Sequence, residues 1–124
     1  MLNTRDARAT WERYAESWKV SGAAAKRALH ETCLAPNCTY TDPLVVAQGR
    51  DALVEYMLEF HHQVPGGHFV TDHFLAHHDR GIARWRMVGG DGTTLSDGIS
   101  YCEYDADGRL RAMTGFFEPP GRGA

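Results

Sequence analysis

The chain has 124 residues, of which 43% are hydrophobic and 23% are charged, which is typical of one soluble globular domain. Its formal net charge of −3 at pH 7 provides no basic surface for a nucleic-acid backbone. The longest purely apolar run, residues 44–47, is too short to span a membrane, and residues 1–14 lack the apolar segment of a secretory signal. We therefore expect a cytoplasmic protein that binds neither nucleic acid nor membranes.

Residues 5–19 are predicted to form the first helix, because aromatic residues recur on one face at a helical spacing. These residues are Trp11, Tyr14 and Trp18. Thr4 is the expected N-cap. The alanine-rich residues 23–32 predict a shorter second helix.

Residues 37–43 suggest a short strand, because they contain β-branched and aromatic residues. Pro43 favours an extended backbone at Asp42, so Asp42 is expected at the end of this strand. After Gly49 an apolar stripe predicts a third helix, which Pro65 ends. The stripe consists of Leu53, Tyr56, Met57, Phe60 and Val64.

The second half of the chain changes to strand patterns separated by glycine-containing turns, which predicts an antiparallel meander. The four segments are residues 68–78, 81–89, 93–104 and 109–117. Helices followed by strands predict an α+β fold in which the helices cover one face of the sheet. We expect a single domain over residues 1–118 and a flexible tail over residues 119–124.

Histidine has an unusual distribution, because six of the seven histidines fall within residues 61–78. His73 and His77 lie on one face of a predicted strand, where His73 could act as a general acid or base if that face is concave. Strand geometry separates them by roughly 13 Å, at about 3.3 Å per residue, which is too far to share a metal ion. No metal site is expected. No nucleotide cofactor is expected either, because the glycine patterns of phosphate-binding loops are absent.

Several short motifs occur along the chain in a recognisable order. They are W-E-R-Y-A-E-S-W, T-Y-T-D-P, G-R-D-A-L-V-E-Y, W-R-M and Y-D-A-D-G-R-L-R-A-M-T-G-F-F. Over residues 5–118 this order resembles the nuclear transport factor 2-like superfamily, and within it the SnoaL-like polyketide cyclases and ketosteroid isomerases. The resemblance implies a cystatin-like α+β roll, in which a cone-shaped, curved antiparallel sheet wraps around three N-terminal helices. It also implies a hydrophobic cavity at the open end of the cone.

The resemblance assigns candidate catalytic roles to three residues. Asp42 matches the general base of ketosteroid isomerases, and Tyr14 matches the tyrosine whose hydroxyl binds the oxyanion. Ser100 stands where those isomerases place a protonated aspartic acid as the second oxyanion donor. Since loss of one such donor costs on the order of 3 kcal/mol in the barrier, efficient steroid isomerisation is not expected. Two structural alternatives stay open: Asp42 could cap the turn at Pro43, and Tyr14 could be a core residue.

Strand alternation predicts residues that line the cavity. If Trp85 points inward, Met87 shares its face, and if Met113 points inward, so does Phe117. The helical residues Trp18, Tyr56 and Phe60 are expected to complete the binding site.

The leading hypothesis is a small cofactor-independent enzyme that transfers a proton on a hydrophobic carbonyl compound. One alternative is a binding protein that holds such a ligand without turnover. Another is an interaction module whose cavity is filled by its own side chains. Ile99, Tyr101 and Phe116 are expected on the outer face of the sheet, where exposed apolar residues suggest a partner surface. Since the superfamily commonly forms homodimers through that face, we expect a homodimer.

Overall fold

The structure, a computed structural model, describes residues 3–119. Within this range, three helices are followed by or interleaved with six strands. The elements in chain order are α1 (Thr4–Ser17), α2 (Ala23–Cys33), β1 (Leu34–Asp42), β2 (Val45–Gln48), α3 (Gly49–Gln63), β3 (His68–His77), β4 (Arg80–Val88), β5 (Thr94–Tyr104) and β6 (Leu110–Phe116). Of the tail expected over residues 119–124, residues 120–124 lie outside the described part of the chain.

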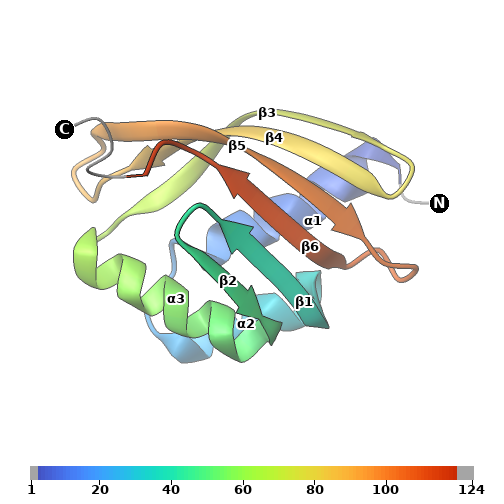
Figure 1. The fold of residues 1–124 in the computed structure, drawn as a ribbon, viewed down its shortest axis with the longest axis horizontal. Helices are drawn as coiled ribbons and strands as arrows, with labels where there is room; N and C mark the ends of the chain where they lie inside the picture. The colour runs from blue at the N-terminus through green and yellow to red at the C-terminus, as the bar shows by residue number, and fades with distance from the viewer. Residues whose placement is uncertain (1–2, 120–124) are drawn as a thin grey trace.

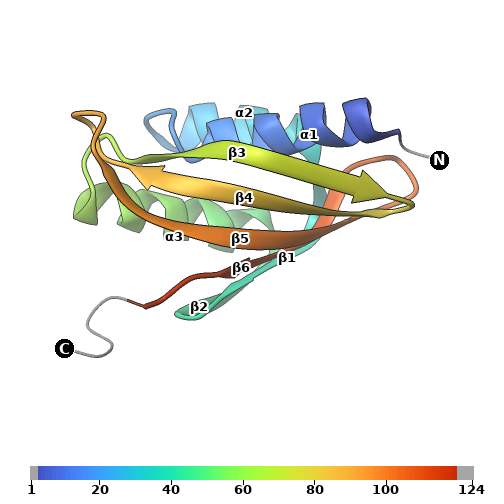
Figure 2. The ribbon, with the colours of Figure 1, turned by 90° about the horizontal axis from the view of Figure 1, so that it is seen from above.

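The strands form one curved sheet in the order β2-β1-β6-β5-β4-β3, and the helices lie on its concave side (Figures 1 and 2). The meander from β3 to β6 is antiparallel, as predicted. Strands β1 and β6 pair in parallel, which departs from an all-antiparallel sheet. Strand β6 thus lies beside β1 in the sheet, although α3 and the rest of the meander separate the two strands in the chain. The predicted α+β cone is confirmed.

The ends of α1 are fixed by side chains. Asn3, and not Thr4, is the N-cap, because its side chain accepts a hydrogen bond from the Asp6 amide at 2.8 Å. At the other end, the fully buried Lys26 ammonium donates to the carbonyl oxygens of Ser17 at 2.9 Å and Val20 at 2.8 Å. These bonds satisfy carbonyls that a helix terminus leaves unpaired, and they fix α2 against α1.

Strand β2 is absent from the sequence prediction. It pairs with β1 across a two-residue turn, with Asp42 opposite Val45. The turn is stabilised by Asp42, whose Oδ1 atom accepts hydrogen bonds from the Leu44 and Val45 amides at 2.8 and 3.1 Å. Asp42 is the last residue of β1, as predicted.

The outer face of the sheet is partly apolar. Ile99 and Phe116 are neighbours across β5 and β6 and are 41% and 60% exposed, so they point outward as predicted. Tyr101 is half-buried on the same face. In the described part of the chain, no helix is both long and apolar enough to cross a membrane.

Candidate functional site

A pocket of about 360 Å³ lies between the helices and the concave face of the sheet. Nine of its nineteen lining residues are aromatic. Helices α1 and α3 contribute Trp11, Tyr14, Tyr56 and Phe60, and Trp18 lines the pocket from the C-cap of α1. The remaining aromatic residues are Tyr40, Phe69, Trp85 and Phe117. The pocket is therefore an aromatic chamber with few polar groups.

Asp42 is the buried carboxylate of the pocket, with 9% of its surface exposed. Its Oδ1 atom caps the turn, while its Oδ2 atom accepts hydrogen bonds from two phenols. Tyr40 donates at 2.6 Å and Tyr56 at 2.8 Å. The turn-capping role and the location in the pocket thus both hold, because each uses a different oxygen atom of one carboxylate.

The phenols around Asp42 are held in the protonated form. Burial raises the pKa of Tyr40 and of Tyr56 well above the usual value, and the adjacent Asp42 carboxylate raises both further. Burial likewise raises the pKa of Tyr14, which lines the same pocket. The phenols that contact Asp42 are Tyr40 and Tyr56, so Tyr14 is not its hydrogen-bond partner.

Ser100, on β5, is oriented by Trp85 of the neighbouring strand β4. The Trp85 indole N–H donates to Ser100 Oγ at 3.0 Å, and both side chains are buried in the pocket wall. A hydroxyl has one donor hydrogen, and this bond uses only the oxygen, so the Ser100 hydrogen is available to a ligand. Trp85 reaches this position because Gly98 lies opposite it in the register. A Cβ atom at Gly98 would lie 2.4 Å from the indole ring.

Asp42 and Ser100 converge beside Gly115. A Cβ atom at Gly115 would lie 3.7 Å from both Asp42 Cβ and Ser100 Oγ, and 3.9 Å from the Tyr40 hydroxyl oxygen. Gly115 is a residue of β6 that pairs directly with Ser100. The missing side chain at Gly115 therefore keeps open the part of the pocket next to Asp42, Ser100 and the Tyr40 hydroxyl.

Most of the residues singled out in the sequence lie around this pocket. They are Tyr14, Trp18, Asp42, Tyr56, Phe60, Trp85, Met87, Ser100 and Phe117. Met113 does not line it. That side chain is 1% exposed and belongs to the hydrophobic core deeper in the molecule, because β6 runs from the core towards the pocket.

His73 lies outside the pocket and is exposed, so the expected acid or base role has no geometric support. The pairing of β3 with β4 is irregular between Thr71 and His73. This bulge places Thr71 in the pocket wall and Phe74 in the core, so His73 between them faces outward.

Sequence reasoning missed Tyr40 as a site residue. Tyr40 is two positions before Asp42 on β1, so strand alternation places both side chains on one face. That signal was present in the sequence. It also missed Phe69 and Thr71, which line the pocket from β3. Thr71 accepts a hydrogen bond from the Trp11 indole at 3.0 Å and forms a second polar point in the wall.

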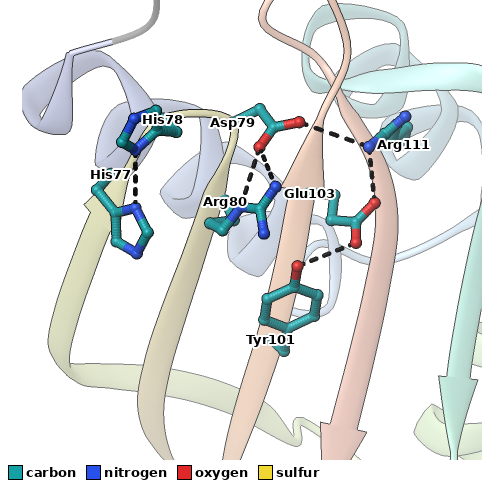
Figure 3. Close-up of polar contacts among 7 residues, drawn as sticks. All are labelled: His77, His78, Asp79, Arg80, Tyr101, Glu103 and Arg111. Atoms are coloured by element: carbon teal, nitrogen blue, oxygen red, sulfur yellow. Dashed lines mark hydrogen bonds and ion pairs between the residues drawn. The ribbon is translucent and has the colours of Figure 1, made fainter.

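A polar network lies at the other end of the sheet, near the β3–β4 turn (Figure 3). Asp79 accepts from Arg80 at 2.9 Å, and Arg111 pairs with Asp79 at 3.5 Å and with Glu103 at 2.9 Å. These side chains are partly exposed, and ion pairs in contact with solvent contribute little to stability. Among residues 3–119, no group of three or more His, Cys, Asp or Glu side chains could hold a metal ion.

Comparison with solved structures places the chain in a known fold. A protein from Agrobacterium tumefaciens, assigned as an isomerase of the SnoaL-like family, superimposes with a TM-score of 0.84 at 22% identity, covering 93% of this chain and 99% of that chain. A protein assigned as a SnoaL-like polyketide cyclase from Jannaschia sp. gives 0.73 at 16% identity, covering 91% and 85%. At such identities the likeness shows the fold alone.

A third protein has a ketosteroid isomerase-like fold, comes from Catenulispora acidiphila and was solved in complex with trimethylamine. It gives a TM-score of 0.73 at 13% identity, covering 88% of this chain and 85% of that chain. No curated protein matches the sequence. The sequence model of the SnoaL-like domain family matches residues 11–113 of this chain.

Proposed function

Because the chain belongs to the SnoaL-like domain family, we propose that it is a small cofactor-independent enzyme acting on a hydrophobic, carbonyl-containing molecule in the pocket. One observation carries the proposal. A buried aspartate, Asp42, and a serine hydroxyl whose hydrogen is not used within the described chain, Ser100, both line one aromatic pocket, and both have atoms close to Gly115. A cytoplasmic location stays a prediction.

In the proposed reaction, Asp42 takes a proton from the carbon next to the ligand carbonyl. The electron pair of the broken C–H bond moves into the carbonyl group and forms an enolate. The enolate oxygen accepts hydrogen bonds from Ser100 and, as the second proposed donor, from Tyr14, which lines the same pocket. Return of the proton from Asp42 to a different carbon completes an isomerisation. Cyclisation and elimination begin with the same first step.

Ser100 suits this role better than an isolated serine would. Its oxygen accepts a hydrogen bond from Trp85, and a hydroxyl that accepts a bond becomes a stronger donor. The burial of both groups also strengthens the interaction, because water does not compete for the enolate oxygen. The pair therefore supplies one strengthened oxyanion donor where ketosteroid isomerases have an aspartic acid.

The test is deuterium exchange at the α carbons of 2-tetralone, a bicyclic aromatic ketone, followed by NMR in heavy water. We expect the wild type to accelerate exchange and Asp42→Asn to lower the enzymatic rate by a factor of about 10²–10⁴, the usual contribution of a general base. The amide side chain of the Asp42→Asn variant keeps a carbonyl oxygen that can accept from the Leu44 and Val45 amides, so the turn is retained.

Asp97→Asn is the matched control, because Asp97 is an exposed carboxylate of β5 outside the pocket. We expect Asp97→Asn to catalyse deuterium exchange of 2-tetralone at the wild-type rate. If Asp42→Asn also exchanges at the wild-type rate, Asp42 is not the base and the enzymatic proposal fails.

A second candidate function is ligand binding without turnover. It is favoured by the hydrogen bonds that the Asp42 carboxylate already accepts. Each carboxylate oxygen already accepts two hydrogen bonds, so a ligand proton would have to displace a phenol. The Catenulispora protein, which holds trimethylamine, is an example of this fold with a bound small molecule. Native mass spectrometry of the purified protein separates the candidates, since a retained ligand that is released unchanged favours binding.

The third alternative, a cavity filled by side chains, has less support. Trp11, Trp18, Trp85 and Phe117 surround the pocket and leave about 360 Å³ between them and the other walls.

A further inference from the structure

The charged groups of the pocket are all of one sign. Asp42 and Glu59 line it, and the part of the wall formed by described residues contains no Lys, Arg or His. Glu59 is exposed, so solvent screens its charge, whereas Asp42 is nine-tenths buried. The charge that a ligand would meet inside the pocket is therefore that of Asp42.

Asp42 has no cationic partner. Every ion pair found among residues 3–119 uses other acidic side chains, and the four donors to Asp42 are two phenols and two amides. A buried carboxylate is costly unless a counter-charge or hydrogen bonds compensate it. Here the neutral donors provide the hydrogen bonds, and no protein group provides the counter-charge.

The walls around this carboxylate also favour a cation. Trp18 packs against Tyr40 and Tyr56 with ring centroids 5.7 and 6.1 Å apart, and these two tyrosines hold Asp42. Phe69 packs against Trp18 at 5.2 Å and against Trp85 at 5.1 Å, so these rings form one continuous aromatic wall. Aromatic faces carry partial negative charge and attract organic cations, most strongly where water is excluded.

We infer that the natural ligand carries an ammonium group that binds beside Asp42 among these rings, and that anionic ligands are excluded. The inference rests on the proposed function, in that it takes the pocket as the ligand site, and it names the ligand class. A positive charge near the reacting carbon stabilises the developing enolate, and the same charge beside Asp42 lowers the basicity of its carboxylate, so the two effects on proton transfer oppose each other. A hydrophobic amino ketone has both the ammonium group and the carbonyl group of the proposed reaction.

The experiment compares three probes that share one bicyclic skeleton and differ in charge at pH 7. They are 2-aminotetralin, which is cationic, 2-tetralol, which is neutral, and tetralin-2-carboxylate, which is anionic. Isothermal titration calorimetry with the whole wild-type chain measures each Kd. We expect the amine to bind at least about tenfold more tightly than the alcohol, and the carboxylate to bind more weakly than both.

Two variants locate the source of the preference. Asp42→Asn should reduce the ratio of amine to alcohol affinity to about one, whereas Glu59→Gln should change it by less than about threefold, because exposed charges are screened. Circular dichroism verifies that each variant is folded. If Asp42→Asn does not fold, the three Kd values of the wild type still test the preference for a cationic ligand.

The outcomes distinguish this inference from the proposed function. Equal binding of alcohol and amine to the wild type overturns the inference and leaves the pocket as a site for neutral ligands. A preference that survives in Asp42→Asn overturns the role of Asp42 as counter-charge. Absence of binding by all three probes, together with no exchange of 2-tetralone, contradicts the proposed function itself.

Discussion

Asp42 combines a structural and a chemical role in one side chain. Its Oδ1 atom fixes the turn between β1 and β2, and its Oδ2 atom faces Tyr40 and Tyr56 in the pocket. This arrangement orients the carboxylate without a cation. The sequence indicated the turn through the Asp-Pro pair and the role in the pocket through the family resemblance, but it could not show that the two coexist.

Gly115 provides a test at the scale of one residue. The Cβ atom of Gly115→Ala would meet Asp42 and Ser100 at ordinary contact distance, 3.7 Å, so we expect a change in unfolding free energy below about 1 kcal/mol. The methyl group would occupy the space proposed for the ligand. We expect the exchange rate of 2-tetralone to fall at least about tenfold, a change equivalent to about 1.4 kcal/mol.

Gly98→Ala is the comparison for Gly115→Ala. Its Cβ atom would lie 2.4 Å from the Trp85 ring, so the ring must move and its bond to Ser100 breaks. We expect a loss of about 1–3 kcal/mol in urea unfolding, as for other overpacked sites. Equal stability of the two variants would contradict the packing described for Trp85.

At the scale of elements, α1 and α2 meet through a buried polar cluster. His30 is fully buried, its Nε2 atom lies 3.0 Å from Ser17 Oγ, and its Nδ1 atom has no partner among the described residues. Burial lowers the pKa of His30 to about 4, and the neighbouring Arg50 and Lys26 charges contribute to the same shift. The packing of α1 against α2 therefore favours the neutral form of the His30 imidazole.

This cluster predicts acid sensitivity. The pKa of His30 is lower in the folded chain than the usual value of about 6.5. The neutral imidazole therefore makes its full contribution to the free energy of unfolding above pH 6.5, and this contribution is lost as the pH falls towards 4. The loss is about 3 kcal/mol, at 1.36 kcal/mol per pH unit. Urea unfolding between pH 7 and 4 should show it, and His30→Gln should flatten the dependence.

The control for His30→Gln is His62→Gln, since His62 is exposed near the end of α3. It should keep the wild-type pH dependence. A wild-type curve that is flat between pH 6.5 and 4.5 would show that His30 is not held neutral.

The elements show where sequence patterns succeed and where they stop. Long periodic segments, such as α3 and the meander, follow from apolar spacing and turn residues. Strand β2 has only four residues, and its pairing depends on the Asp42 turn, which is a tertiary feature. The bulge before His73 changes which residues of β3 face the pocket and which face outward, and no local sequence pattern specifies this change. Both differences are set by pairing between strands.

At the scale of the whole molecule, we propose that two copies pair through the outer face of the sheet. Two apolar pairs lie on this face, Leu75 opposite Ile82 on β3 and β4 and Ile99 opposite Phe116 on β5 and β6, and all four side chains are more than 40% exposed. The network of Figure 3 places both signs of charge on these same strands. A face with both signs suits a two-fold contact between identical surfaces.

Light scattering tests this proposal at micromolar concentration. We expect a mass of twice the 13.8 kDa chain for the wild type and a monomer for Phe116→Glu. Leu44→Glu is the matched control, because Leu44 is similarly exposed, 58% against 60%, but lies at the pocket. A wild-type monomer at this concentration would contradict the proposed dimer.

The central claim is that the aromatic pocket is the ligand site, and the methionine methyl groups test it most directly. Of the methionines, Met87 lines the pocket, whereas Met57 and Met113 are buried in the core away from it. In a methyl-¹³C methionine spectrum titrated with 2-tetralone, the Met87 signal, assigned with Met87→Leu, should move most. If the Met87 signal does not move at saturating ketone, or if the Met57 or Met113 signal moves more, the ligand does not bind at the proposed site.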